Sequence, residues 1–444
     1  LRDTYFLDLN FGYTGSANFA KGDRFGFFPA GAIGWVLSEE KFFAPLRDVF
    51  DLVKFKASYG IVGNDQIGGN RRFIYNETVD TNGGSYQFGT GNTTYTGDYS
   101  TGLRLGNWAN ASVGWEKAYK LNVGAEVSLF GKLRVQADYF RERREGIFLQ
   151  ASSNPRISGL STAPWINAGK MKNHGVDASL EYHQRVGIVE LTVRGNFTYA
   201  HNTILDNDQP RWAEPYLNKI GQSNWQEYGL VAAGLFSSQE EIDAWPVQSW
   251  GEVHPGDIKY LDLNGDGIVS PDDRKPIGYP NVPEITYGFG ASVKWKGFDL
   301  SVFFQGVGNV NFFANNTYTQ PFTANSVSLS NVFTDLIGNY WSENNPDANA
   351  KYPRLTTSAN PNNSQQSTFW MVNGRYMRLK NAEIGYSLPK KVVNKLRIDG
   401  LRVYISGMNL LTFSDFKLWD PDLQTGAANY PNNRVYNIGV SLIF

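Results

Sequence analysis

The chain lacks several features that would place it in a familiar soluble class. Its 444 residues include no Cys, only 4 His and 4 Met, and carry a formal net charge of −1. The absence of Cys excludes a disulfide scaffold and thiol chemistry, and it fits a protein of the cell envelope. The near-neutral charge offers no basic footprint, so we expect no nucleic-acid partner.

Long apolar runs are missing as well. No stretch approaches the roughly 18 residues of a transmembrane helix, which excludes a helical membrane protein. The lack of long apolar runs does not exclude a transmembrane β-barrel, because barrel strands are apolar only at alternate positions. Aromatic residues (15%) and Gly (46 residues) are abundant, and the mean hydropathy is −0.38. This composition is typical of barrels and also of large secreted β proteins.

The C-terminal segment Val435–Phe444 alternates with a period of two, which indicates a β-strand. One face is apolar and the other is small or polar, with Tyr436, Ile438, Val440, Leu442 and Phe444 against Asn437, Gly439 and Ser441. A tilted barrel strand needs about ten residues to cross a bilayer. The segment therefore resembles the closing strand of an outer-membrane barrel; the alternative is the last strand of a soluble sandwich.

Twelve segments share this alternation. They are Thr4–Tyr13, Phe25–Leu37, Leu52–Ile61, Ala118–Phe130, Leu133–Phe140, His174–His183, Val189–Tyr199, Glu284–Trp295, Phe298–Gln305, Tyr376–Leu388, Leu401–Leu411 and Val435–Phe444. Their polar faces carry Lys, Glu, Arg and Asp, and each such charge would cost roughly 2–4 kcal/mol if it faced lipid near the midplane. We therefore expect the apolar faces to contact lipid and the polar faces to line a wet lumen.

The connections between these segments alternate in length without exception. Short ones fall near residues 131, 187, 296 and 390, with a moderate one at Ser38–Asp51. The long ones are Thr14–Arg24, Val62–Lys117, Arg144–Met171, His201–Pro283, Gly306–Arg375 and Thr412–Arg434. Barrels of outer membranes follow this rule, with short periplasmic turns and long extracellular loops. The sequence thus predicts an all-β fold, a transmembrane antiparallel β-barrel with about 12 strands in this chain.

One segment has the spacing of an EF-hand calcium loop. Oxygen-bearing side chains recur at its positions 1, 3 and 5, Gly267 stands at 6, and a carboxylate stands at 12. The expected ligands are Asp262, Asn264, Asp266, the carbonyl of Ile268, Ser270 and Asp273. The Asp at position 12 is shorter than the usual Glu, and no helix clearly precedes the loop. The alternatives are a structural Ca²⁺ site and a turn whose carboxylates accept from local backbone N–H groups.

Catalytic patterns are weak, and we expect no enzyme. The four His show no metal spacing, and there is no nucleophile elbow or phosphate loop. Aromatic residues are instead frequent in the long connections, namely Trp225, Trp245, Trp250, Tyr318, Tyr340, Trp341 and Trp370. Aromatic platforms beside Asn and Gln suit sugars or peptides, and the alternative is that long loops pack these rings against one another.

Several phrases resemble the SusC/RagA family of TonB-dependent outer-membrane transporters of the Bacteroidetes type. They are spread over essentially the whole chain and include Gly12-Tyr13-Thr14-Gly15-Ser16, Arg24-Phe25-Gly26-Phe27-Phe28-Pro29, Ala57-Ser58-Tyr59-Gly60, Pro255-Gly256-Asp257-Ile258-Lys259-Tyr260 and Arg378-Leu379-Lys380-Asn381. Each phrase alone is weak, whereas their joint occurrence is specific.

The resemblance implies a barrel of about 22 strands with a plug. Residues 1–444 would be its C-terminal part, and we expect the plug and the N-terminal strands to lie outside this sequence. The start at Leu1, without an initiator Met or signal peptide, supports that expectation. The final strand should then be an edge of the sheet, unless another polypeptide or a smaller closed barrel supplies its partner.

The resemblance also implies a function and partners. These are TonB-dependent import of oligosaccharides or peptides across the outer membrane of a Gram-negative bacterium, with a SusD-like surface lipoprotein over the extracellular mouth. TonB would act through the missing N-terminal part, and the remainder of the barrel and lipid would flank this wall. The alternatives are a self-contained passive porin and a surface-binding barrel or adhesin.

Overall fold

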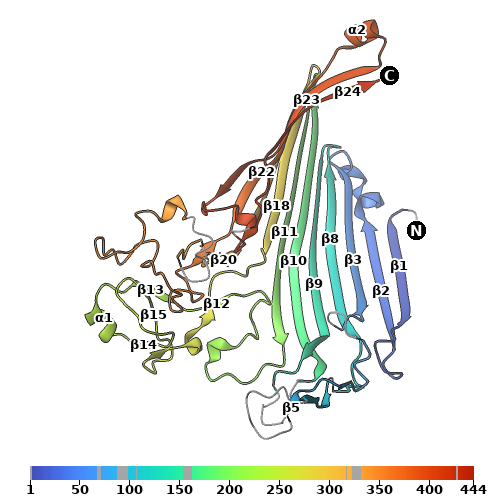
Figure 1. The fold of residues 1–444 in the computed structure, drawn as a ribbon. Helices are drawn as coiled ribbons and strands as arrows, with labels where there is room; N and C mark the ends of the chain where they lie inside the picture. Colours follow the sequence, from blue (N-terminus) through green and yellow to red (C-terminus); the bar gives the residue numbers. More distant parts are fainter. Residues whose placement is uncertain are drawn as a thin grey trace.

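The computed structural model describes residues 3–67, 72–87, 99–106, 108–153, 163–316, 318–322, 332–426 and 429–444. Its main element is a 12-stranded antiparallel sheet in which strands follow one another in chain order (Figure 1). The strands are β1 (Tyr5–Gly15), β2 (Phe25–Val36), β3 (Phe50–Asn64), β8 (Glu116–Leu129), β9 (Leu133–Gln150), β10 (Trp165–Val186), β11 (Val189–Asp206), β18 (Ile285–Trp295), β19 (Phe298–Gly308), β22 (Tyr376–Ser387), β23 (Gly400–Ser414) and β24 (Val435–Ile443). The predicted all-β fold, with an antiparallel barrel-type sheet of about 12 strands, is confirmed.

Smaller elements lie in the connections. They are β4 (Val79–Asp80), β5 (Ser85–Gln87), β6 (Tyr99–Thr101), β7 (Arg104–Leu105), β12 (Tyr228–Gly229), β13 (Ala232–Leu235), α1 (Gln239–Asp243), β14 (Val247–Gln248), β15 (Ile258–Tyr260), β16 (Ile268–Val269), β17 (Lys275–Pro276), β20 (Asn311–Phe313), β21 (Met371–Asn373), α2 (Lys390–Val393) and short 3₁₀ turns. No helix in the described part of the chain is long and apolar enough to cross a membrane.

The short connections gather at one end of the sheet, which we call the turn end, and the long ones at the other, the loop end (Figure 1). The turn from β18 to β19 consists of Lys296 and Gly297, whose φ angles are 46° and 88°. Positive φ at both central residues gives the twist that joins antiparallel strands in a two-residue hairpin. The tight turn that the sequence predicted at Lys296 and Gly297 is therefore confirmed.

The strands begin where predicted at the turn end, but several extend further at the loop end. β9 continues to Gln150 and β10 starts at Trp165, so half of the predicted connection Arg144–Met171 is strand. The prediction of a long loop there is wrong for a physical reason. Beyond the lipid both faces of a strand meet water, so the alternation that marks a half-buried strand disappears.

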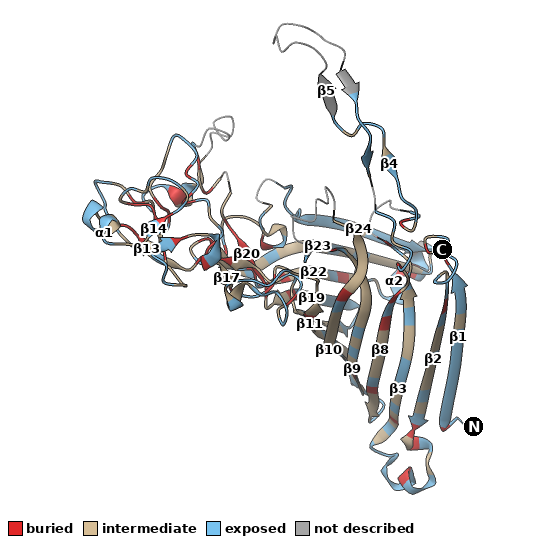
Figure 2. Cartoon of the chain, turned by 90° about the horizontal axis from the view of Figure 1, so that it is seen from below, coloured by how far each residue is buried: buried red, intermediate tan, exposed pale blue. Residues whose placement is uncertain are grey.

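Buried apolar residues lie mainly in the loops rather than in the wall (Figure 2). The largest cluster joins the connections β11–β18 and β19–β22, and two smaller ones surround Phe19 and Phe312. Within the described residues β1 and β24 are the edge strands of the sheet, as expected for Val435–Phe444. The molecule thus combines an open curved wall with packed loops at one end.

Candidate functional site: the two-faced wall and the loop domain

One face of the wall is apolar and strongly exposed. On β1 the side chains of Leu9 and Phe11 are 70% and 78% exposed, and on β24 that of Ile438 is 80% exposed. Ring pairs reinforce this face, among them Tyr13 stacked on Phe25 at 5.2 Å between centroids. So much exposed apolar surface would cause aggregation in water, and its place on every second residue is the pattern of a lipid-facing barrel wall.

The opposite face carries cross-strand ion pairs. Lys56 Nζ on β3 lies 2.8 Å from Oδ1 of Asp138 on β9, and Arg194 on β11 bonds Glu181 on β10 at 3.0 Å. Closer to the turn end, Arg402 on β23 contacts Asp299 on β19 and Glu383 on β22. The Arg194–Glu181 and Arg402–Glu383 pairs join neighbouring strands, where opposite charges stabilise the register, and the other two pairs reach across an intervening strand. Both signs of charge therefore line this polar face.

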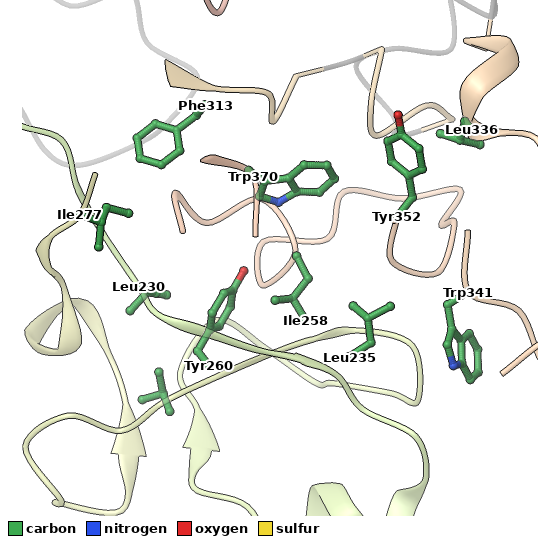
Figure 3. Packing of buried hydrophobic residues seen from close by; sticks show 11 residues of the cluster. Leu230, Leu235, Ile258, Tyr260, Ile277, Phe313, Leu336, Trp341, Tyr352 and Trp370 are labelled. Carbon is green, nitrogen blue, oxygen red and sulfur yellow. The ribbon is translucent and has the colours of Figure 1, made fainter. Parts of the chain in front are cut away.

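The two longest connections fold together at the loop end. Residues 228–277, 311–316 and 332–371, which we call the loop domain, share one apolar cluster (Figure 3). Leu230, Leu235, Ile258 and Tyr260 come from the first connection, and Trp341, Tyr352 and Trp370 from the second. Backbone bonds cross between them, such as Leu235 N to Ala348 O at 3.1 Å. The loop domain is therefore built like the core of a small soluble domain.

Asp257 is the polar centre of the loop domain. Its carboxylate is fully buried and accepts from Arg354 Nε at 2.7 Å, from Asn360 Nδ2 at 2.9 Å and from Asn363 Nδ2 at 2.9 Å. The backbone N–H of His254 donates to the second oxygen at 2.8 Å. Because a buried carboxylate needs this many donors to offset its lost hydration, Asp257 fixes the two connections in one arrangement.

The connection from β23 to β24 folds back onto the wall through Arg378. This side chain on β22 is only 2% exposed; it donates to Asp422 at 2.8 Å and also contacts Asp420. Thr412 Oγ1 accepts from its Nε at 3.1 Å. The contacts tether residues 415–426 to the polar face at the loop end.

A cavity of about 370 Å³ lies between the loop domain and this tethered segment. Asp335, Lys351 and Trp370 line it on one side, and Phe416 and Lys417 on the other. Lys351 and the hydroxyl of Tyr352 donate to Asp335 and hold the pKa of its carboxyl below the usual range. Rings beside a fixed carboxylate and two amines can hold a ligand that has both apolar and hydrogen-bonding groups.

The Asp262 loop has the backbone shape that its spacing predicts. Gly265 and Gly267 have φ angles of 77° and 86°, and the Asp262 carboxylate accepts from both of their N–H groups. Asp273 is fully buried and accepts from the N–H groups of Leu263 and Ser270, each at 2.7 Å. In the described residues no group of three or more His, Asp or Glu is placed to hold a metal. Any cation here would therefore depend on Asn264, Ser270 and backbone oxygens as well.

Most of the predicted loop aromatics pack within the protein. Trp341 and Trp370 are buried in the cluster, and Trp250 and Tyr340 pack against it. Trp245 donates from its indole N–H to Tyr260 O at 2.8 Å, and Tyr318 lies 5.8 Å from the ring of Phe333. For these six rings the structure therefore agrees with the alternative in which the loops pack their aromatic side chains within the protein. Trp225 is different, because it is 53% exposed and comes three residues before the loop domain in the sequence.

Sequence reasoning did not find the polar centres at Asp257 and Arg378. Asp257 and Arg354 are 97 residues apart in the chain, and no local pattern links them. The phrases that contain Asp257 and Arg378 were noticed only as family resemblance.

Comparison with known proteins agrees with this architecture. Residues 2–410 match the family model described as TonB dependent receptor-like, beta-barrel. TonB-dependent receptor P3 of Formosa agariphila is 27% identical over 97% of this chain and 43% of its own length. TonB-dependent receptor SusC of Bacteroides thetaiotaomicron is 25% identical over 100% of this chain and 42% of its own length.

Solved structures give the same fold. A chain of the RagAB peptide importer in the closed-closed state superposes with a TM-score of 0.75 and 23% identity, over 99% of this chain and 46% of that chain. A second RagAB structure gives a TM-score of 0.74 at 22% identity. The chain thus spans less than half the length of the relatives that it matches.

Proposed function

Because this chain belongs to the TonB-dependent receptor-like β-barrel family, we propose that it forms part of the wall and the extracellular loops of a nutrient importer in the outer membrane of a Gram-negative, Bacteroidetes-type bacterium. The cargo would be an oligosaccharide or a peptide too large for a passive pore, and the chain acts as a transporter rather than an enzyme. The observation that carries the proposal is the packed loop domain at one end of a two-faced wall. Binding residues often lie on loops that a rigid scaffold holds in position, and here the wall would be that scaffold.

The proposed importer requires domains and partners that are not in this chain. The remaining strands, the plug and the contact with TonB would come from a further part of the protein, since the relatives are more than twice as long as the match. A SusD-like lipoprotein would cover the extracellular mouth. The exposed parts of the loop domain and Trp225 are the surfaces that we assign to partner or nutrient contact.

Two experiments test this proposal in the intact protein. Native purification followed by mass spectrometry should show a chain longer than 444 residues together with a surface lipoprotein. Deletion of the gene should abolish growth on at least one glycan or peptide mixture. Unchanged uptake of every glycan and peptide would contradict import, and ion conduction by an isolated chain of this length would favour the passive porin. Binding of cells to a surface without uptake would favour the adhesin.

The cavity between the loop domain and residues 415–426 is the site where we place part of the nutrient. Lys417→Gln removes an exposed amine that lines it. The change should lower the uptake rate at limiting nutrient while leaving the amount of folded protein unchanged. Lys391→Gln in α2 at the turn end is the matched control and should transport normally. Equal rates for the two variants would remove the cavity from the transport path.

We also propose that the Asp262 loop binds Ca²⁺ in a structural role. The supporting observation is a short turn, with positive φ at Gly265 and Gly267, in which Asp262, Asn264 and Asp266 place side-chain oxygens against backbone N–H groups of the loop. Millimolar Ca²⁺ should slow hydrogen exchange across residues 258–277 of the full protein, and Asp262→Asn should remove that effect. Identical exchange with Ca²⁺ and with a chelator would leave the simple turn as the correct description.

A further inference from the structure

The apolar face of the wall changes character at the loop end of β9 and β10. Positions directly opposite each other form rows across the strands. One row places Tyr139 beside Val123 on β8 and Val176 on β10, and it is apolar. The next row of the same face places Arg141 beside His174, and the row after it places Arg143 beside Lys172. On β9 and β10 the lipid-facing pattern therefore ends in two rows of basic side chains, which continue on β8 as Leu121 and Tyr119.

These basic groups are poorly neutralised. Arg143 pairs with Glu145 at 2.8 Å. Neither Arg141 nor Lys172 has a carboxylate within 4.0 Å in the parts of the chain that the structure describes. On the polar face, by contrast, Arg134 and Arg194 each contact a Glu. Unpaired basic groups are thus concentrated on the outer side of these strands.

A groove accompanies the basic rows. Its volume is about 410 Å³, and it lies over β3, β8 and β9 on the outer face. Tyr59, Tyr119 and Leu121 form its apolar and aromatic part, and Arg141, Arg143 and Glu145 form its charged part. Apolar residues that border guanidinium groups match a molecule with a hydrocarbon portion and an anionic head.

The height of the groove matches the surface of a membrane. A barrel strand rises about 3.3 Å per residue and tilts by about 40°, so the climb from Leu133 at the turn to Arg141 is about 20 Å. The apolar band of an outer-membrane barrel is about 25 Å tall. Arg141 and Arg143 therefore lie at the outer boundary of that band, where lipid headgroups are found.

We propose that Arg141, Arg143 and Lys172 form a binding site on the outer wall for the phosphorylated headgroup of an outer-leaflet lipid. The planar guanidinium binds phosphate oxygens through two parallel N–H bonds, and Lys172 adds a point charge. Tyr59, Tyr119 and Leu121 would contact the upper part of the acyl chains. This site rests on the placement of the wall in the outer membrane, which is part of the proposed function.

The test uses the full-length protein purified in detergent, with added diphosphorylated lipid A as the probe. Arg141→Gln with Arg143→Gln should weaken binding of this lipid by about 30-fold, because each basic side chain near an anionic lipid surface contributes about fivefold. The matched control is Arg134→Gln with Arg194→Gln, which removes two arginines from the polar face and should leave lipid binding unchanged.

A second measurement does not depend on any variant folding correctly. The unaltered protein should bind diphosphorylated lipid A much more tightly than dephosphorylated lipid A with the same acyl chains. Equal binding of the two lipids overturns the proposal, as does a double variant that binds like the unaltered protein. Binding of inorganic phosphate as tightly as the lipid would overturn the assignment to a lipid.

The outcomes for lipid binding and for transport are distinguishable. Normal import with no preference for the phosphorylated lipid rejects only the lipid site. Phosphate-dependent lipid binding without import of any glycan or peptide rejects only the nutrient proposal. Failure of the protein to fractionate with outer membranes would reject both.

Discussion

The wall and the loop domain solve the problem of burial in opposite ways. The wall has its large apolar side chains on the outside, as with Leu9 at 70% exposure, and its charges on the other face. The loop domain keeps Leu230, Tyr260 and Trp370 inside and its charges mostly outside, as a soluble domain does. The comparison shows that one chain is folded for two solvents, with the change occurring at the loop ends of the strands. Stability should therefore depend on different interactions in the two regions.

The sharpest way to separate the regions is to remove the polar centre of the loop domain. Asp257→Ala leaves Arg354 without its carboxylate and should destabilise the loop domain by about 3–5 kcal/mol. Hydrogen exchange of the full protein should accelerate in residues 228–277 and 332–371, while β10 keeps its protection. Glu252→Ala is the control. Glu252 is exposed and its carboxylate makes a long contact, 4.0 Å, with the His254 ring, so its loss should change little. Equal loss of protection in β10 would show that the regions do not fold independently.

The converse experiment places a charge on each face of the wall. Leu180→Arg puts a cation on the apolar face of β10 and should cost about 2–4 kcal/mol near the bilayer midplane. Ser179→Arg, the neighbouring residue on the polar face, should cost much less, because it lies among Gln136 and Asn196. Urea unfolding from lipid vesicles measures both variants. A larger cost for Ser179→Arg would reverse the assignment of the two faces.

Arg378 links the wall to the loops and should show an intermediate effect. Arg378→Gln removes a buried cation from Asp420 and Asp422 and should cost about 1.5–3 kcal/mol. Limited proteolysis should then cleave residues 415–426 more quickly. Arg375→Gln breaks an exposed pair with Asp415 on the same segment and should cost less than about 1 kcal/mol. Similar proteolysis of both variants would mean that burial of Arg378 does not hold the segment.

The sequence predicted the wall well because a lipid-facing strand must alternate. The predicted first residues of β9, β11 and β19, which are Leu133, Val189 and Phe298, agree with the structure, because each comes directly after a tight turn. The same rule failed at the loop end of β9, where Arg141 and Arg143 occupy apolar-face positions and the alternation no longer indicates a strand. Where the lipid-facing band ends, the constraint that made prediction possible ends with it.

The loop domain could not be predicted in the same way, because its contacts are distant in sequence. Trp341 and Trp370 were identified as loop aromatics, yet the sequence left packing and ligand contact as equal alternatives. Their burial follows from the pairing of two connections around Asp257, which no local motif specifies. The Asp262 loop forms the turn that was one of its two alternatives, with its carboxylates accepting from local N–H groups, while the cation itself stays a prediction.

The smallest expected effect concerns pH and separates the regions once more. In the loop domain, the Lys259 amine and then Ser237 hold the pKa of the Glu241 carboxyl at about 2, below its ordinary 4.5. Because the folded pKa is depressed, the stabilisation is complete above about pH 4.5 and is lost as the pH falls toward 2. The pair is partly open to solvent, so it should contribute about 1 kcal/mol. Glu241→Gln should accelerate exchange around α1 at pH 7, and the difference from the unaltered protein should shrink toward pH 2. A difference that stays constant with pH would mean that Glu241 acts through packing rather than through its charge.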